Sequence, residues 1–261
     1  MSTESNSEWP LGVMRRGWGT VMRWIETVDR VLRRQPLELT PDGARKSDGR
    51  ISLRRTASIV MVLGPVYGAA MGAYAWVAGE RMLLEQIPQM LYSGIKVPLL
   101  IAVTVLIALP SFFVINTLLG LRDDLRDSLA AIISAQAGMV MILASLFPLT
   151  LFIYVSTSHA DFSYPLAILT NAAMFGLASF SAQVLLRGYY SPLIAKNPRH
   201  RWMVRSWILV YAFVGIQASY VLRPFIGNPD VPVSFFRKDS FENAYIRVFQ
   251  LAADVIQGFF Q

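Results

Sequence analysis

Five long runs of apolar residues constrain this chain more than any other feature. None contains Asp, Glu, Lys, Arg or His, and they cover about 56–78, 97–119, 129–155, 166–186 and 206–222. A helix needs roughly 17–25 apolar residues to cross the hydrocarbon core of a bilayer, where charged side chains are costly. We therefore predict an all-α, polytopic membrane protein with five transmembrane helices.

The composition excludes an ordinary water-soluble enzyme. Of the 261 residues, 54% are hydrophobic and only 16% are charged, whereas soluble domains carry about 25% charged residues. Cysteine is absent, which excludes disulfides, thiolate metal sites and thiol catalysis.

The distribution of basic residues predicts the orientation. With the N-terminus in the cytoplasm, eighteen of the 24 Lys and Arg residues lie on the cytoplasmic side. The loop at 196–201 is basic, whereas the loop at 156–164 has no basic residue. The positive-inside rule therefore favours an N-in, C-out topology. Because Arg greatly outnumbers Lys, we expect a GC-rich bacterial genome and a location in the bacterial cytoplasmic (inner) membrane.

Amphipathic segments flank the apolar runs. Residues 1–35 predict a basic helix that lies on anionic lipid at the cytoplasmic face or packs against protein, with a basic side made of Arg15, Arg16, Arg23, Arg30, Arg33 and Arg34. Residues 36–55 predict a flexible polar linker. Residues 223–261 predict an outer segment with an amphipathic C-terminal helix, and a sixth span over 240–261 is the alternative. Dispersed basic residues do not favour binding of nucleic acid.

Small residues predict where helices approach one another. Gly64, Gly68 and Gly72 recur every four residues, and Ala172 and Gly176 repeat the spacing once. Helices in lipid associate through such small side chains because these let the two backbones come close. We expect both stripes to pack against neighbouring helices.

Three amide side chains fall at similar depths in three spans, and they are Asn116, Gln136 and Gln183. We expect them to meet in one layer near the cytoplasmic third of the membrane. Hydrogen bonds between such amides hold helices together, and a site for a solute or a lipid head group is the alternative.

Three aspartates follow the second run, in the order Asp123, Asp124 and Asp127. Over six residues this Asp-Asp-x-x-Asp spacing resembles the aspartate-rich motif of prenyl-transferring enzymes, which implies a magnesium and diphosphate site. The second acidic motif of that family is missing here. The alternative is a solvated turn in which Asp127 and Ser128 cap the following helix.

No other catalytic constellation, metal site or cofactor motif is present, so we expect a protein that is not an enzyme. Our first hypothesis is an accessory or scaffold subunit of a bacterial inner-membrane complex, with other membrane-protein subunits as partners. The alternative is a channel or uniporter for an uncharged or lipid-like solute. A lipid- or prenyl-modifying enzyme that uses the aspartates is the remote alternative.

Overall fold

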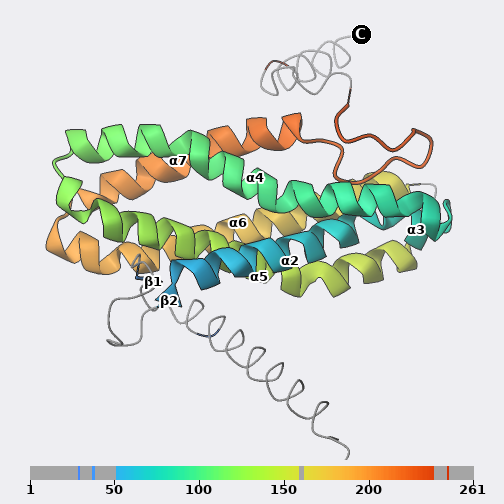
Figure 1. Cartoon of the computed structure of the whole chain (residues 1–261), viewed down its shortest axis with the longest axis horizontal. Helices are drawn as coiled ribbons and strands as arrows, with labels where there is room; N and C mark the ends of the chain where they lie inside the picture. The colour runs from blue at the N-terminus through green and yellow to red at the C-terminus, as the bar shows by residue number, and fades with distance from the viewer. Residues whose placement is uncertain (1–28, 30–36, 39–50, 159–161, 238–245, 247–261) are drawn as a thin grey trace, which may run out of the picture.

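A computed structural model describes residues 29, 37–38, 51–158, 162–237 and 246, and shows an elongated bundle whose long helices run along one axis (Figure 1). Its helices are α2 (Leu53–Gly72), α3 (Tyr74–Val77), α4 (Leu83–Leu118), the 3-10 helix η1 (Arg122–Asp124), α5 (Leu125–Ser156), α6 (Ser163–Lys196) and α7 (His200–Val221). Two short strands, β1 (Leu37–Glu38) and β2 (Ile51–Ser52), pair in parallel before α2.

The two flanking amphipathic helices stay predictions. The basic N-terminal helix with its six arginines lies outside the described residues, and so does nearly all of the C-terminal helix. The predicted linker is described only at its ends, where the strands pair and α2 begins at Leu53, inside the predicted range.

Four helices are long and apolar enough to cross a membrane, namely α4, α5 together with η1, α6 and α7. The apolar part of α2, Ala57–Gly72, is shorter. The helical, multi-pass membrane class is therefore confirmed. The count of five spans and the orientation stay predictions.

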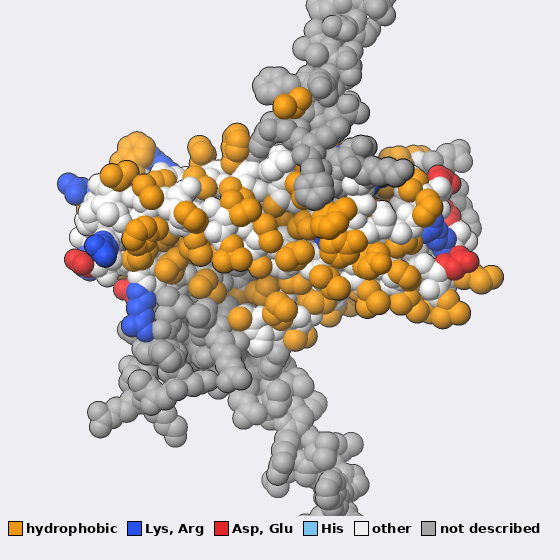
Figure 2. Space-filling model, turned by 45° about the horizontal axis from the view of Figure 1, so that its top comes forward, with side chains coloured by type: hydrophobic (Ala, Val, Ile, Leu, Met, Phe, Trp, Pro, Cys, Tyr) orange, Lys and Arg blue, Asp and Glu red, His pale blue; other side chains and the backbone are white. Residues whose placement is uncertain are grey.

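The described surface has the polarity that a bilayer requires. Hydrophobic side chains cover the length of the bundle, while Lys, Arg, Asp and Glu gather at its two ends (Figure 2). Outward residues such as Leu106, Phe152 and Phe180 are more than 60% exposed, whereas polar residues such as Gln89 and Ser93 are fully buried. An exposed apolar exterior around a partly polar interior suits a lipid solvent, which cannot hydrogen-bond to polar groups.

Several helix bounds differ from the predicted spans, and α6, for example, extends to Lys196, ten residues beyond 186. The first run does not form one helix, because α2 ends at Gly72 and a turn at Ala73 separates it from α3. Helix α4 begins at Leu83, well before the apolar run at 97–119. As a result Lys96, one residue before the predicted span at 97–119, lies within α4 and is fully buried.

The glycines of α2 lie directly against α4. A Cβ added at Gly68 would fall 2.2 Å from the Ser93 carbonyl oxygen, and one at Gly72 would fall 2.7 Å from the Gln89 carbonyl oxygen. At Gly64 the nearest atoms are on the Pro98 ring, at 3.3 Å. Only glycine permits this approach at Gly68 and Gly72, since the obstructing atoms there belong to the α4 backbone.

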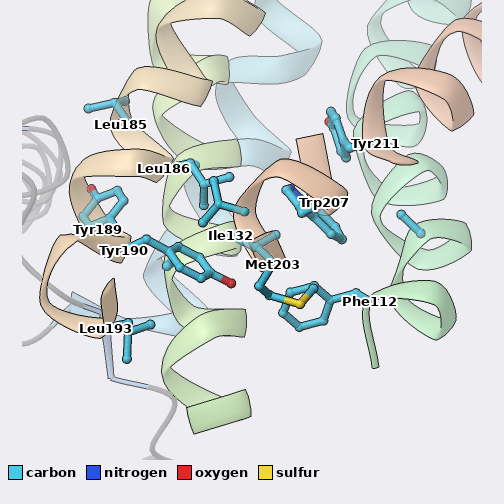
Figure 3. Close-up of a cluster of buried hydrophobic side chains, with 14 of the residues drawn as sticks. Phe112, Ile132, Leu185, Leu186, Tyr189, Tyr190, Leu193, Met203, Trp207 and Tyr211 are labelled. Carbon is cyan, nitrogen blue, oxygen red and sulfur yellow. The ribbon is translucent and has the colours of Figure 1, made fainter. Parts of the chain in front are cut away.

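An aromatic cluster joins four helices near the η1 end of the bundle (Figure 3). Phe112 of α4 meets Trp207 of α7 edge to face at 5.3 Å between ring centroids, and Trp207 lies 5.5 Å from Tyr211. Ile132 of α5 and Tyr190 of α6 complete the contact, and all five side chains are buried. The helices are thus held together at this end.

We predict that Gly68→Ala lowers the free energy of unfolding by about 1–3 kcal/mol, the usual cost of overpacking. The added methyl group would collide with the α4 backbone. Unfolding in a denaturing detergent, followed by circular dichroism, measures the change. Gly64→Ala is the matched control, since its Cβ meets only the Pro98 ring at 3.3 Å. Equal effects of the two substitutions would contradict the assignment.

Candidate functional site

An elongated cleft separates α6 from α7 and is the candidate site. Its volume is about 880 Å³, within the range of about 300–1,000 Å³ typical of small-molecule sites. Helix α4 contributes Leu100 and Thr104, and α5 contributes Met139. The segment that follows α7 closes one end of the cleft with Pro224 and Phe225.

The walls of the cleft are apolar and its rim faces the lipid-exposed side of the bundle. Phe175 and Ile208 line the interior from opposite helices. Ile168, Phe180 and Ile216 also line it, and they are 46%, 69% and 52% exposed. A solute could therefore enter sideways from the acyl chains of the bilayer without crossing a polar barrier.

Most polar groups on the walls already bond to the protein. Thr104 Oγ1 donates to the Leu100 carbonyl oxygen at 2.7 Å. Tyr67 Oη donates to Asn171 Oδ1 at 3.1 Å, and Asn171 Nδ2 donates to the Ala167 carbonyl oxygen at 2.8 Å. These bonds brace the helices and leave the cleft with a mainly apolar lining.

The three predicted amides do not form one layer. Gln136 Oε1 accepts a hydrogen bond from Tyr211 Oη of α7 at 2.7 Å. Gln183 lines the cleft, and its Oε1 has no hydrogen-bond partner among the described residues. Asn116 is buried near the η1 end, also without a side-chain hydrogen bond in the described part.

The opposite directions of α4 and α7 explain why Asn116 lies apart from Gln136. Phe112 of α4 meets Trp207, one helical turn before the Tyr211 that binds Gln136. Asn116 lies one turn after Phe112 in α4. Because α4 and α7 run in opposite directions, this turn leads away from Tyr211. Of the three amides, only Gln183 belongs to the cleft.

The second small-residue stripe does not pack on a helix, so this prediction is wrong. Ala172 and Gly176 both line the cleft and are exposed. A Cβ added at Gly176 would meet no atom within 4 Å. The cleft occupies the space in which a packed neighbour was expected, and the missing side chain at Gly176 widens it.

The segment after α7 is anchored to α4 and to the loop that precedes α4. Lys96 Nζ donates to the Pro224 carbonyl oxygen at 2.6 Å. The Phe225 carbonyl oxygen accepts from Ser93 Oγ and, at 3.2 Å, from Gln89 Nε2. These bonds satisfy buried polar groups of α4 and fix the end wall of the cleft.

The aspartates after α4 do not assemble a metal site. Asp124 is buried and binds Lys196 Nζ, with His200 Nε2 at 3.1 Å from its other oxygen, whereas Asp123 and Asp127 are exposed. No group of three metal-binding side chains occurs in the described part of the chain. The expected cap is also wrong, because α5 begins at Leu125 and Asp124 is its N-cap residue.

Sequence reasoning missed the roles of His200 and Lys96. His200 was expected in a loop, but it is the first residue of α7 and is fully buried. Its spacing of four residues from Lys196 is a local signal, but the partner Asp124 lies 76 positions away from His200 in the sequence. Nothing in the local sequence around Lys96 predicts that its ammonium group donates a hydrogen bond to the distant carbonyl group of Pro224.

We predict that Asp124→Asn lowers the melting temperature in detergent. The substitution removes the negative charge that Lys196 and His200 share, and so loosens the connection between η1 and the α6–α7 turn. Asp123→Asn is the matched control, because Asp123 is exposed and adjacent. The assignment would be overturned by an equal melting temperature for Asp124→Asn and the unchanged chain.

The comparisons with known proteins add no family to these observations. No family model, curated protein or solved structure matches the chain. The assignment of a function therefore depends on the cleft and on the residues around it.

Proposed function

We propose that this chain is a non-enzymatic, multi-pass membrane protein that binds a lipid-like solute in the cleft between α6 and α7. The lateral opening of an apolar cleft onto the lipid-exposed surface carries the proposal. Such a cavity would otherwise cost stability, since its lining atoms lose packing contacts. Acyl chains from the bilayer can restore those contacts.

The cleft supports the proposal of solute binding more directly than it supports the accessory-subunit hypothesis. A scaffold needs complementary outer faces, and the exposed apolar side chains could provide them, but lipid tails cover such faces equally well. A deep cleft has no role in simple docking. Other membrane-protein subunits therefore remain a second proposal, which mass spectrometry of co-purifying proteins tests.

We further propose that α2 is the fifth span, with the N-terminus in the cytoplasm and the C-terminus outside. The apolar part of α2, Ala57–Gly72, extends about 24 Å, and α3 (Tyr74–Val77) continues the apolar run towards the thickness of a hydrocarbon core. Close packing of the α2 glycines on α4 supports this placement. The excess of basic residues on the proposed inner side supports the orientation, and a bacterial cytoplasmic membrane is the proposed location.

We predict that Gly176→Phe weakens phospholipid binding on the order of tenfold. The open space at Gly176 would accommodate the ring, and displacing about two methylene groups of a bound chain costs about 1.6 kcal/mol. Native mass spectrometry in a neutral detergent measures the bound lipid.

The matched control for this test is Leu177→Phe. Leu177 is the next residue of α6, is 52% exposed and does not line the cleft. It should bind phospholipid as the unchanged chain does. Equal lipid binding by both variants would contradict a site in the cleft.

The absence of cysteine gives a direct test of orientation, since a single introduced thiol reports its side of the membrane. Asn197→Cys should react with an impermeant maleimide only after the membrane is opened, and Ser158→Cys should react in intact cells. Gel-shift labelling measures both. The reverse pattern would reject the N-in, C-out proposal.

A further inference from the structure

We propose that the end of the cleft next to the C-terminus of α7 binds the phosphate head group of an anionic lipid, whose acyl chain lies along the apolar walls. This inference rests on the proposed function and adds the class of lipid. Two arginines, Arg223 and Arg237, line the cleft at this end. They supply the charge that an anionic head group needs.

The two guanidinium groups belong to the first and last residues of the segment 223–237, and both lie at the same end of the cleft. Arg223 follows α7 directly, and its guanidinium lies 3.6 Å from the centroid of the Tyr220 ring. Arg237, fourteen residues later, lies close enough to the Tyr164 hydroxyl of α6 to interact with it. Both tyrosines also line the cleft, so they hold the cations at its margin.

The charged residues that line the cleft are all basic. No Asp or Glu occurs among the described residues that line the cleft. The buried ammonium of Lys96 lies behind the end wall, bonded to the Pro224 carbonyl oxygen and 4.8 Å from the centroid of the Phe235 ring. Because charges interact more strongly away from water, this arrangement favours an anion at the wall.

The end wall is ordered before any ligand binds. Arg81 donates to the Val231 carbonyl oxygen at 2.8 Å and to the Asn228 carbonyl oxygen at 3.4 Å. Gly227 packs on the Gln89 side chain, which a Cβ there would approach to 2.9 Å. A segment already held in place loses little conformational entropy on binding, which favours affinity.

The chemistry of the site favours an amphiphile with an anionic head group and an apolar chain. A guanidinium group presents a planar fork of donors that matches the oxygens of a phosphate. A lipid without a phosphate would offer the arginines no anionic group, and a free phosphate ion would leave the apolar walls unfilled. An anionic phospholipid satisfies both parts of the cleft.

Titration with two lipids that have identical acyl chains tests the head group. The full chain in neutral detergent receives phosphatidylglycerol or diacylglycerol, which has the same acyl chains but no phosphate, and native mass spectrometry measures the bound fraction. We expect phosphatidylglycerol to bind at least about tenfold more tightly, since hydrogen bonds to charged groups contribute about 1.5–3 kcal/mol. The double variant Arg223→Gln/Arg237→Gln should bind the two lipids equally.

The matched control is Arg201→Gln/Arg205→Gln. It removes the same charge from exposed positions on α7 that do not line the cleft, and it should keep the preference. A loss of preference in this control as well would assign the effect to net charge and overturn the head-group site.

The remaining outcomes separate this inference from the proposed function. If the unchanged chain binds both lipids equally and Gly176→Phe weakens both, the cleft is a lipid site and the head-group inference is wrong. If the unchanged chain binds neither lipid, both proposals fail.

Discussion

The close contact between α2 and α4 is the constraint on which the rest of the bundle depends. Glycines at 68 and 72 allow two backbones to touch, and this fixes the rotation of α4 about its axis. Ser93, Gln89 and Lys96 are then buried rather than exposed. Buried donors require acceptors, and the carbonyl groups of Pro224 and Phe225 provide them. The segment after α7 is held in place as a consequence.

The cleft exists because α6 and α7 are joined firmly at one end only. Near η1, the contacts of Tyr190 and Trp207 and the Asp124–His200–Lys196 cluster close the gap between the helices. Towards the other end, small residues such as Gly176 and Gly215 line the space that remains. The same sequence feature thus has two opposite effects. Glycine brings helices together where a backbone faces it, and it leaves a cavity where none does.

The sequence alone predicts the class of fold but not the site. Uncharged runs and the spacing of Gly64, Gly68 and Gly72 are local patterns with a direct physical meaning in lipid, so spans and a close helix contact follow from them. The same four-residue spacing at Ala172 and Gly176 gave a wrong packing prediction, because the spacing of small residues does not determine whether another helix packs against them. Lys96 and Gln136 form hydrogen bonds with residues more than 70 positions away. Such pairings have no local signal.

The distribution of buried charge argues for a binding site rather than an ion-coupled pump. Lys96, Asp124 and His200 are the buried ionisable residues of the described part, apart from tyrosines. Asp124 pairs with Lys196 and lies 3.1 Å from His200 Nε2 at the η1 end, and the ammonium of Lys96 is bonded to a main-chain carbonyl group. Proton-coupled transport uses carboxylates or histidines that change their protonation inside the membrane. The buried charges of the described part take part in internal contacts, whereas Arg223 and Arg237 line the cleft, where we propose that they meet a ligand.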